Sequence, residues 1–162
     1  MAYGSSMKQI VLVAFDRFTD IDLFLAWDLF GRLPAETCRT RIVAASSKIT
    51  SSTGITIEPH GRIAETRDAD AVYFCSGQGT RALGHLRGRR ATTYPSPDLQ
   101  ERLRAAGATA VEENLVIEGN VANAAQCLAG VDLVRWVMTR LFGVDVANGT
   151  IATAEALPLA TR

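Results

Sequence analysis

Apolar residues occur along this chain in short continuous runs, which polar or glycine-rich turns separate. The first run, residues 9–15 (Gln-Ile-Val-Leu-Val-Ala-Phe), is rich in β-branched side chains. Further strand-like segments follow at 39–45, which is apolar from 42 to 45, and at 71–75. Unbroken apolar runs of this length are typical of strands that are buried on both faces of a parallel sheet. The pattern therefore predicts three buried strands.

Apolar residues at helical spacing lie between these strands and after them. Residues 21–32 have a wide apolar surface, and residues 126–142 carry the longest apolar stripe. Further helices are predicted at 97–106 and 144–156, and further strands at 55–59, 90–94, 109–111 and 115–118. Strands and helices in this order predict an α/β sandwich with a mostly parallel central sheet.

Size and charge narrow the class of protein. The 162 residues are 48% apolar, which predicts one domain at 9–157, after a tag remnant and lead-in at 1–8 and before a tail at 158–162. Lys and Arg (17) balance Asp and Glu (17), so no basic surface for nucleic acid or membrane is expected. No apolar run reaches the roughly 18 residues that span a bilayer. Three cysteines suggest no disulfide framework, so we expect a cytoplasmic protein with reduced thiols.

The segment Cys75-Ser76-Gly77 directly follows the third predicted strand. A cysteine on a tight turn between a strand and a helix can be a nucleophile, because the helix N-terminus lowers the pKa of the thiol. In that interpretation Cys75 attacks the substrate, and backbone N–H groups of Gly77 and Gln78 stabilise the developing negative charge. In the other interpretation Cys75 is a buried residue at the strand end, and 76–80 is a glycine-rich loop. Gly77, Gln78 and Gly79 are the candidate oxyanion- or ligand-binding residues of this segment.

Asp22 lies in the otherwise apolar stretch 21–25, just after the first predicted strand. A carboxyl group in apolar surroundings has a raised pKa and can keep or shuttle a proton. The alternative is a carboxylate in the first turn of a helix, where the helix dipole favours it. Because the carboxyl ends of parallel strands meet at one edge of a sheet, Asp22 and Cys75 are expected close together. Thr93 and Tyr94 are the last residues of the strand predicted at 90–94, and we expect them to bind the ligand at the same edge.

The remaining reactive side chains give weaker signals. Cys127 lies in the first turns of the longest predicted helix and is either an activated thiol or a packing residue. His60 and His85 have no spaced partners, so no metal site is predicted. The glycine-rich segment 76–80 matches neither a phosphate-binding loop nor a dinucleotide fingerprint. We therefore expect no cofactor.

Three stretches, taken in order, carry a family resemblance. The first is 10–30, the second is 70–81, and the third is 88–95 (Gly-Arg-Arg-Ala-Thr-Thr-Tyr-Pro), which 116–121 and 129–133 follow. They resemble the DJ-1/PfpI superfamily of class I glutamine amidotransferase-like proteins, and within it the isonitrile hydratase-like and regulator-like branch. The resemblance implies a flavodoxin-like α/β sandwich, a homodimer, a small-molecule substrate or ligand, and a reactive cysteine beside an acid that Asp22 matches.

The chain departs from the family pattern between Val72 and Arg90. Members of the family have a glycine-rich loop after the third strand, and then a further strand that ends in a cysteine elbow with its helix. This chain has only one such element. Either 76–81 is the glycine-rich loop and the strand-elbow-helix unit is missing, which we favour, or Cys75-Ser76-Gly77 is the elbow and the earlier loop is missing. A third explanation is that this chain omits a native segment. Tyr94-Pro95 also replaces the family's frequent histidine.

Two functions follow from the resemblance. The first is a cysteine-dependent enzyme that acts on a small electrophile, as an isonitrile hydratase-like lyase or hydrolase, with Cys75 as nucleophile and Asp22 as acid. The second is a catalytically degenerate domain that binds a small molecule in a regulatory role. The missing element and the absent histidine favour the second, and the Cys-Ser-Gly turn favours the first.

Overall fold

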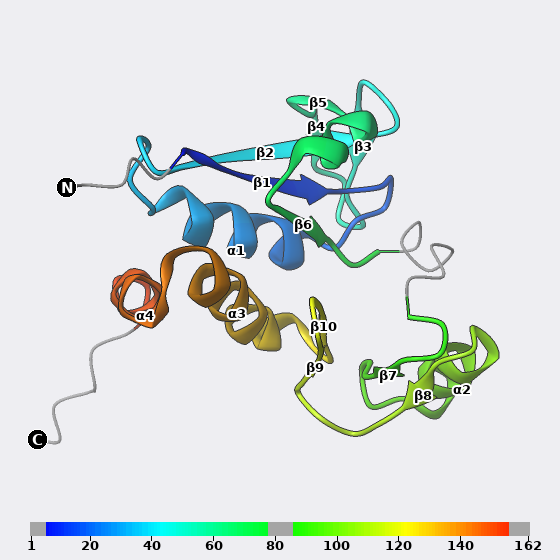
Figure 1. Cartoon of the computed structure of the whole chain (residues 1–162). Helices are drawn as coiled ribbons and strands as arrows, with labels where there is room; N and C mark the ends of the chain where they lie inside the picture. Colours follow the sequence, from blue (N-terminus) through cyan, green and yellow to red (C-terminus); the bar gives the residue numbers. More distant parts are fainter. Residues whose placement is uncertain (1–5, 78–85, 156–162) are drawn as a thin grey trace, which may run out of the picture.

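The computed structural model describes residues 6–77 and 86–155 of the chain. Its central sheet has four parallel strands in the order β5 (Gly61–Arg62), β2 (Cys38–Ala44), β1 (Lys8–Val13) and β6 (Ala71–Phe74). Val11 of β1 pairs with Arg41 on one side and with Val72 on the other. The predicted α/β fold with a mostly parallel sheet is confirmed (Figure 1).

Both faces of β1 are buried, which explains its unbroken apolar sequence. Ile10 and Leu12 enter the main core, which also contains the buried side chains of the helices. Val11 and Val13 enter a smaller core on the opposite face, against which Ile63 of the 3-10 helix η1 (Ile63–Asp68) packs. Alternate residues of one strand therefore join two separate layers, as the twofold repeat of a strand requires.

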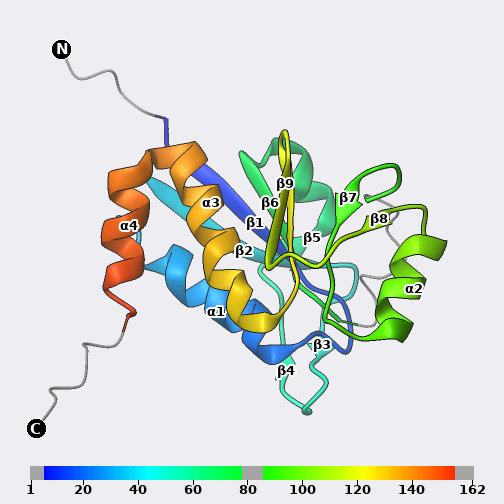
Figure 2. The same ribbon diagram turned by 90° about the horizontal axis from the view of Figure 1, so that it is seen from below.

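The helices α1 (Asp20–Gly31), α3 (Gly130–Phe142) and α4 (Val144–Ala152) cover the main-core face of the sheet (Figure 2). Phe30, Val134, Met138 and Ile151 are almost completely buried there. The helix predicted to begin at residue 126 begins at Gly130, because strand β10 (Val121–Ala124) and the short 3-10 helix η3 (Cys127–Ala129) precede it. No helix in residues 6–77 and 86–155 is long and apolar enough to cross a membrane.

The remaining strands form three separate pairs. The pair β3 (Ile49–Thr50) and β4 (Thr56–Ile57) and the pair β9 (Leu115–Glu118) and β10 are antiparallel. The strands β7 (Arg90–Ala91) and β8 (Thr109–Ala110) are parallel, and α2 (Pro97–Ala105) connects them. In the part of the chain that the structure describes, β7 is paired with β8 and not with β6, so the predicted sheet is interrupted at this point.

The strand predicted at 90–94 ends at Ala91, because the backbone of the next residue, Thr92, is hydrogen-bonded to a side chain instead of to a strand. The Asn123 amide accepts a hydrogen bond from the Thr92 backbone N–H (3.1 Å) and donates one to the Thr92 carbonyl (2.6 Å). The Thr92 hydroxyl donates to the carbonyl of Glu113 (2.6 Å). The two bonds of Asn123 connect β10 to the end of β7 across a separation of 31 residues.

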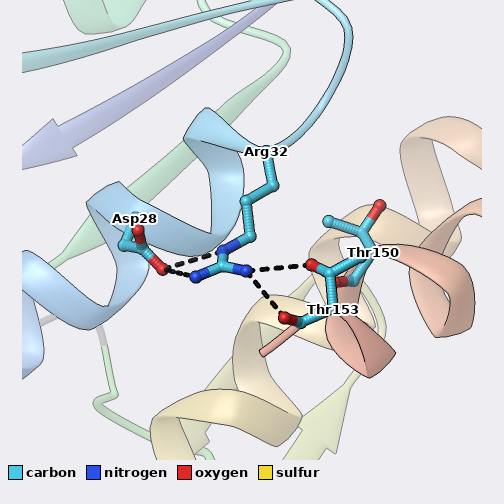
Figure 3. A network of polar contacts seen from close by, with 4 residues as sticks. All are labelled: Asp28, Arg32, Thr150 and Thr153. Atoms are coloured by element: carbon cyan, nitrogen blue, oxygen red, sulfur yellow. Dashed lines mark hydrogen bonds and ion pairs between the residues drawn. The ribbon is translucent and has the colours of Figure 1, made fainter. Parts of the chain in front are cut away.

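A polar network connects the C-terminal ends of α1 and α4 (Figure 3). The Arg32 guanidinium binds the Asp28 carboxylate (2.8 Å) and donates to the carbonyl and hydroxyl oxygens of Thr153 (2.9 and 3.0 Å). The Thr153 hydroxyl donates to the carbonyl of Thr150 (2.6 Å). Arg32 thus donates a hydrogen bond to the Thr153 carbonyl. This carbonyl lies just after the last turn of α4, where the helix itself provides no donor.

We expect Arg32→Ala to lower the free energy of unfolding by about 1–2 kcal/mol, because it removes hydrogen bonds from a charged donor. Amide hydrogen exchange at the end of α4 should become faster. Arg102→Ala is the matched control. Among the described residues, the one side-chain partner of Arg102 is Asp98 in an exposed pair within α2, which is worth about 0.5 kcal/mol. Equal losses in the two variants, measured by urea denaturation, would show that the contacts with α4 contribute nothing.

Candidate functional site

The loop after β1 and the end of β6 meet at one edge of the central sheet. Phe18 forms an antiparallel bridge with Gly77, and the Thr19 backbone N–H donates to the Ser76 carbonyl (3.1 Å). Thr19 also precedes the first residue of α1. These backbone bonds bring the first turn of α1 against the residues that follow β6, as the rule for carboxyl ends of parallel strands predicts.

Asp22, in the first turn of α1, is the centre of a small polar cluster. The Ser76 hydroxyl donates a hydrogen bond to its carboxylate, and Ser76 Oγ also lies 3.0 Å from the Thr19 hydroxyl. Asp22 is partly buried and Ser76 is exposed, so solvent reaches the cluster. An acceptor that is held in place by a hydroxyl at an open edge can bind a polar ligand or take a proton.

The thiol of Cys127 also belongs to this cluster. Burial raises the pKa of Cys127, and a hydrogen bond with the Asp22 carboxylate and the charge of that carboxylate raise it further. All three effects favour the protonated thiol, which can donate to a carboxylate. Cys127 is only partly buried. The sequence suggested this residue only as a weak candidate, because its partner is about 100 positions away.

Tyr73 lies beneath the cluster with its side chain in the main core. Burial is the largest cause of its raised pKa, and the charges of Cys75, Asp22 and Cys127 act in the same direction. The phenol is therefore protonated at neutral pH. No functional signal in the local sequence points to Tyr73, which has the pattern of an ordinary residue in a buried strand.

Cys75, the predicted nucleophile, has no exposed surface and lies in the main core. Its backbone N–H donates to the Val13 carbonyl (3.0 Å), so Cys75 continues β6 past Phe74. Burial raises the pKa of the thiol strongly, and the nearby Asp22 carboxylate adds to this effect. A protonated and buried thiol is a poor nucleophile. The catalytic role of Cys75 stays a prediction.

The other predicted ligand residues lie in different surroundings. Gly77 has φ 152° and contacts the backbone of Arg17 and Phe18, whereas Gln78 and Gly79 lie outside the described residues. Thr93 lines a surface hollow of about 150 Å³, and Tyr94 is 57% exposed. Within residues 6–77 and 86–155, no hydrogen bond joins Thr93 or Tyr94 to Asp22.

The hollow beside Thr93 has acidic and amide side chains, among them Glu112, Glu113 and Gln126. Glu113 is paired with Arg90, and Glu112 accepts a hydrogen bond from Gln100 (3.2 Å). In the described part of the chain, no group of three or more His, Cys, Asp or Glu side chains could hold a metal ion.

Several solved structures share this fold, among them DJ-1/PfpI superfamily proteins and a transcriptional regulator. A ThiJ/PfpI family protein from Pseudomonas syringae has a TM-score of 0.80 and 23% identity, and the match covers 94% of this chain and 76% of that chain. Drosophila melanogaster DJ-1beta has a TM-score of 0.78 and 13% identity, covering 94% and 100% of the two chains. An AraC family transcriptional regulator from Pseudomonas putida has a TM-score of 0.76 and 14% identity, covering 91% and 100%.

These matches show that the chain has the flavodoxin-like fold of the DJ-1/PfpI superfamily. No protein-family model matches the sequence, and no curated protein is significantly similar to it. The structures cited above are 13–23% identical to this chain, which shows a shared fold alone. The chemistry therefore has to follow from the residues of the site.

Proposed function

We propose that this chain is a catalytically degenerate DJ-1/PfpI-like domain that binds a small molecule at the Asp22 cluster in a regulatory role. The complete burial of the Cys75 thiol carries the proposal, because this thiol cannot meet a substrate where it lies. The interruption between β6 and β7 supports it, since a strand-elbow-helix unit would be expected at this place in the sheet. A regulator among the proteins of the same fold is consistent with such a role.

The second candidate is an isonitrile hydratase-like enzyme that acts on a small electrophile. It is favoured by the position of Asp22, which is held by Ser76 at the edge of the sheet where β1 and β6 end. In this alternative Asp22 is the acid and Cys75 the nucleophile. The Cys75 thiol would then have to leave the core and lose its proton before it reacts.

Thiol labelling separates the two candidates. In the native protein we expect iodoacetamide to modify Cys75 at least about 100-fold more slowly than in the urea-unfolded chain, because access requires the core to open. Isonitriles and glyoxal should raise the melting temperature of the native protein without conversion to product. Asp22→Asn should abolish this stabilisation, and Asp145→Asn, which removes an exposed carboxylate from the first turn of α4, should keep it.

The contrary result is equally specific. Rapid, stoichiometric labelling of Cys75, with turnover of an isonitrile or glyoxal that Cys75→Ser abolishes, would establish the enzyme.

We also propose the homodimer that the family resemblance implies, to be measured by light scattering.

A further inference from the structure

Three backbone donors around Asp22 already have acceptors within the protein. The N–H groups of Asp22 and Leu23 both donate to the Thr19 carbonyl (3.2 and 3.3 Å), and the Thr19 N–H donates to the Ser76 carbonyl (3.1 Å). Amides at the start of a helix bind anions where they have no other acceptor. These three amides are in use, so they are not available to an anionic ligand.

The side-chain oxygens of the same cluster have hydrogen-bonding capacity left, and it is mainly the capacity to accept. The Ser76 hydroxyl donates to the Asp22 carboxylate, and Ser76 Oγ lies 3.0 Å from Oγ1 of Thr19. A hydroxyl has one hydrogen and two lone pairs, whereas a carboxylate has lone pairs alone. Ser76 has therefore used its hydrogen inside the cluster. A ligand that binds Ser76 and Asp22 has to supply the donors.

No cationic side chain in residues 6–77 and 86–155 forms an ion pair with the Asp22 carboxylate. The titratable groups that sense its charge are Tyr73, Cys75 and Cys127. Burial is the largest cause of their raised pKa values and the charge of Asp22 contributes to each, so all three are neutral near pH 7. The dipole of α1 offsets about half an elementary charge. Part of the negative charge is therefore left for a ligand to neutralise.

Apolar side chains are exposed next to residues of the cluster. Ile21, which precedes Asp22 in α1, is 42% exposed, and Leu128, which follows Cys127, is 73% exposed. A hydrocarbon chain gains free energy when it covers such side chains, and an inorganic cation does not. The combination of a carboxylate, hydroxyl acceptors and exposed apolar side chains favours an organic cation.

We propose that the ligand of the Asp22 cluster is a small primary alkylammonium ion. The Asp22 carboxylate neutralises its charge, and its N–H groups donate to this carboxylate and to the hydroxyl oxygens of Ser76 and Thr19. The alkyl group covers the exposed side chains of Ile21 and Leu128. The two hydroxyls select a primary ammonium over a quaternary one, which has no N–H to donate. This proposal rests on the proposed function and names the chemical class of its ligand.

An NMR titration of the isotope-labelled full-length chain with n-butylammonium chloride, at pH 7 and constant ionic strength, tests the proposal. The amide signals of Ser76 and of the first turn of α1 should shift. We expect n-butylammonium to bind at least about 10-fold more tightly than 1-butanol, because hydrogen bonds to charged groups are stronger than those between neutral groups. The n-butyltrimethylammonium ion should bind severalfold more weakly than n-butylammonium, and sodium butyrate should not bind.

Three variants locate the interaction. Asp22→Asn should weaken n-butylammonium binding at least about 10-fold, because the amide carries no charge. Ser76→Ala should bring the affinities for n-butylammonium and n-butyltrimethylammonium closer together, because one acceptor is lost. Asp145→Asn is the control, since it removes an exposed carboxylate from the first turn of α4 and should leave the affinity unchanged.

Equal affinities of the native chain for n-butylammonium and 1-butanol would overturn the proposal, whatever the variants do. Equal losses in Asp22→Asn and Asp145→Asn would overturn it as well, because the charge would then act from a distance and not from the cluster. Displacement of n-butylammonium by an equal concentration of sodium or potassium ions would show a site for inorganic cations instead. Stabilisation by isonitriles and glyoxal, which tests the proposed function, does not depend on these results, so the two can fail separately.

Discussion

Raising the pH above 9 should destabilise this protein progressively, with Cys75 and Tyr73 as the main causes. Burial raises the pKa of both groups above their ordinary values of 9.0 for the thiol and 10.0 for the phenol. Below these values the folded and unfolded states bind the same protons, and the stabilising contribution is complete. Above them the unfolded chain loses protons that the folded chain keeps. Each group then lowers the free energy of unfolding by about 1.4 kcal/mol per pH unit.

The expected loss at pH 11 is about 4 kcal/mol, a large part of the roughly 5–15 kcal/mol that stabilises a typical domain. Raised pKa values of Cys38 and Cys127 act in the same direction. Urea denaturation, followed by circular dichroism at pH steps from neutral to alkaline, measures the effect. Cys75→Ala should give a shallower pH dependence, although its cavity lowers stability by a constant amount. Parallel curves for wild type and variant would contradict the burial of this thiol.

The local pattern of apolar residues predicted the elements of the main core. The runs at 9–15, 39–45 and 71–75 became β1, β2 and β6, and the stripe at 144–156 contained α4. These elements bury their apolar residues against a neighbouring layer, so the spacing of those residues in the sequence reveals the type of element. The early end of β7 was not predictable in this way, because it depends on Asn123, which lies far along the chain.

The sequence placed Asp22 and the end of β6 at one edge of the sheet, but it could not assign the thiol. Successive side chains of a strand point to opposite faces. Tyr73 and Cys75 share a face and are both buried, whereas Ser76 is exposed and binds Asp22. Which face enters the core depends on α3 and η3, more than 50 residues later in the chain. The proximity of Asp22 to Cys127 also depends on how η3 and α3 pack, so the local sequence could not predict it.

Gly77→Ala should lower the free energy of unfolding by about 2–4 kcal/mol and disrupt the Asp22 cluster. An added Cβ would lie 2.8 Å from the Arg17 carbonyl oxygen and 2.8 Å from the Phe18 Cα, and both of these atoms belong to the backbone. The φ of 152° adds strain for a residue with a side chain. The bridge between Phe18 and Gly77 must therefore separate, and the adjacent bond between Thr19 and Ser76 is expected to lengthen with it.

Gly54→Ala provides the matched control. Gly54 also has a positive φ (102°), but no atom lies within 4 Å of an added Cβ, so its loss should stay near 1 kcal/mol. Urea denaturation measures both losses, and the alkylation rate of Cys127 reports whether the cluster is disturbed. We expect Gly77→Ala to change both quantities and Gly54→Ala to change stability alone. Equal losses would mean that the close approach of the two chain segments does not hold the site, because backbone strain alone would then account for both variants.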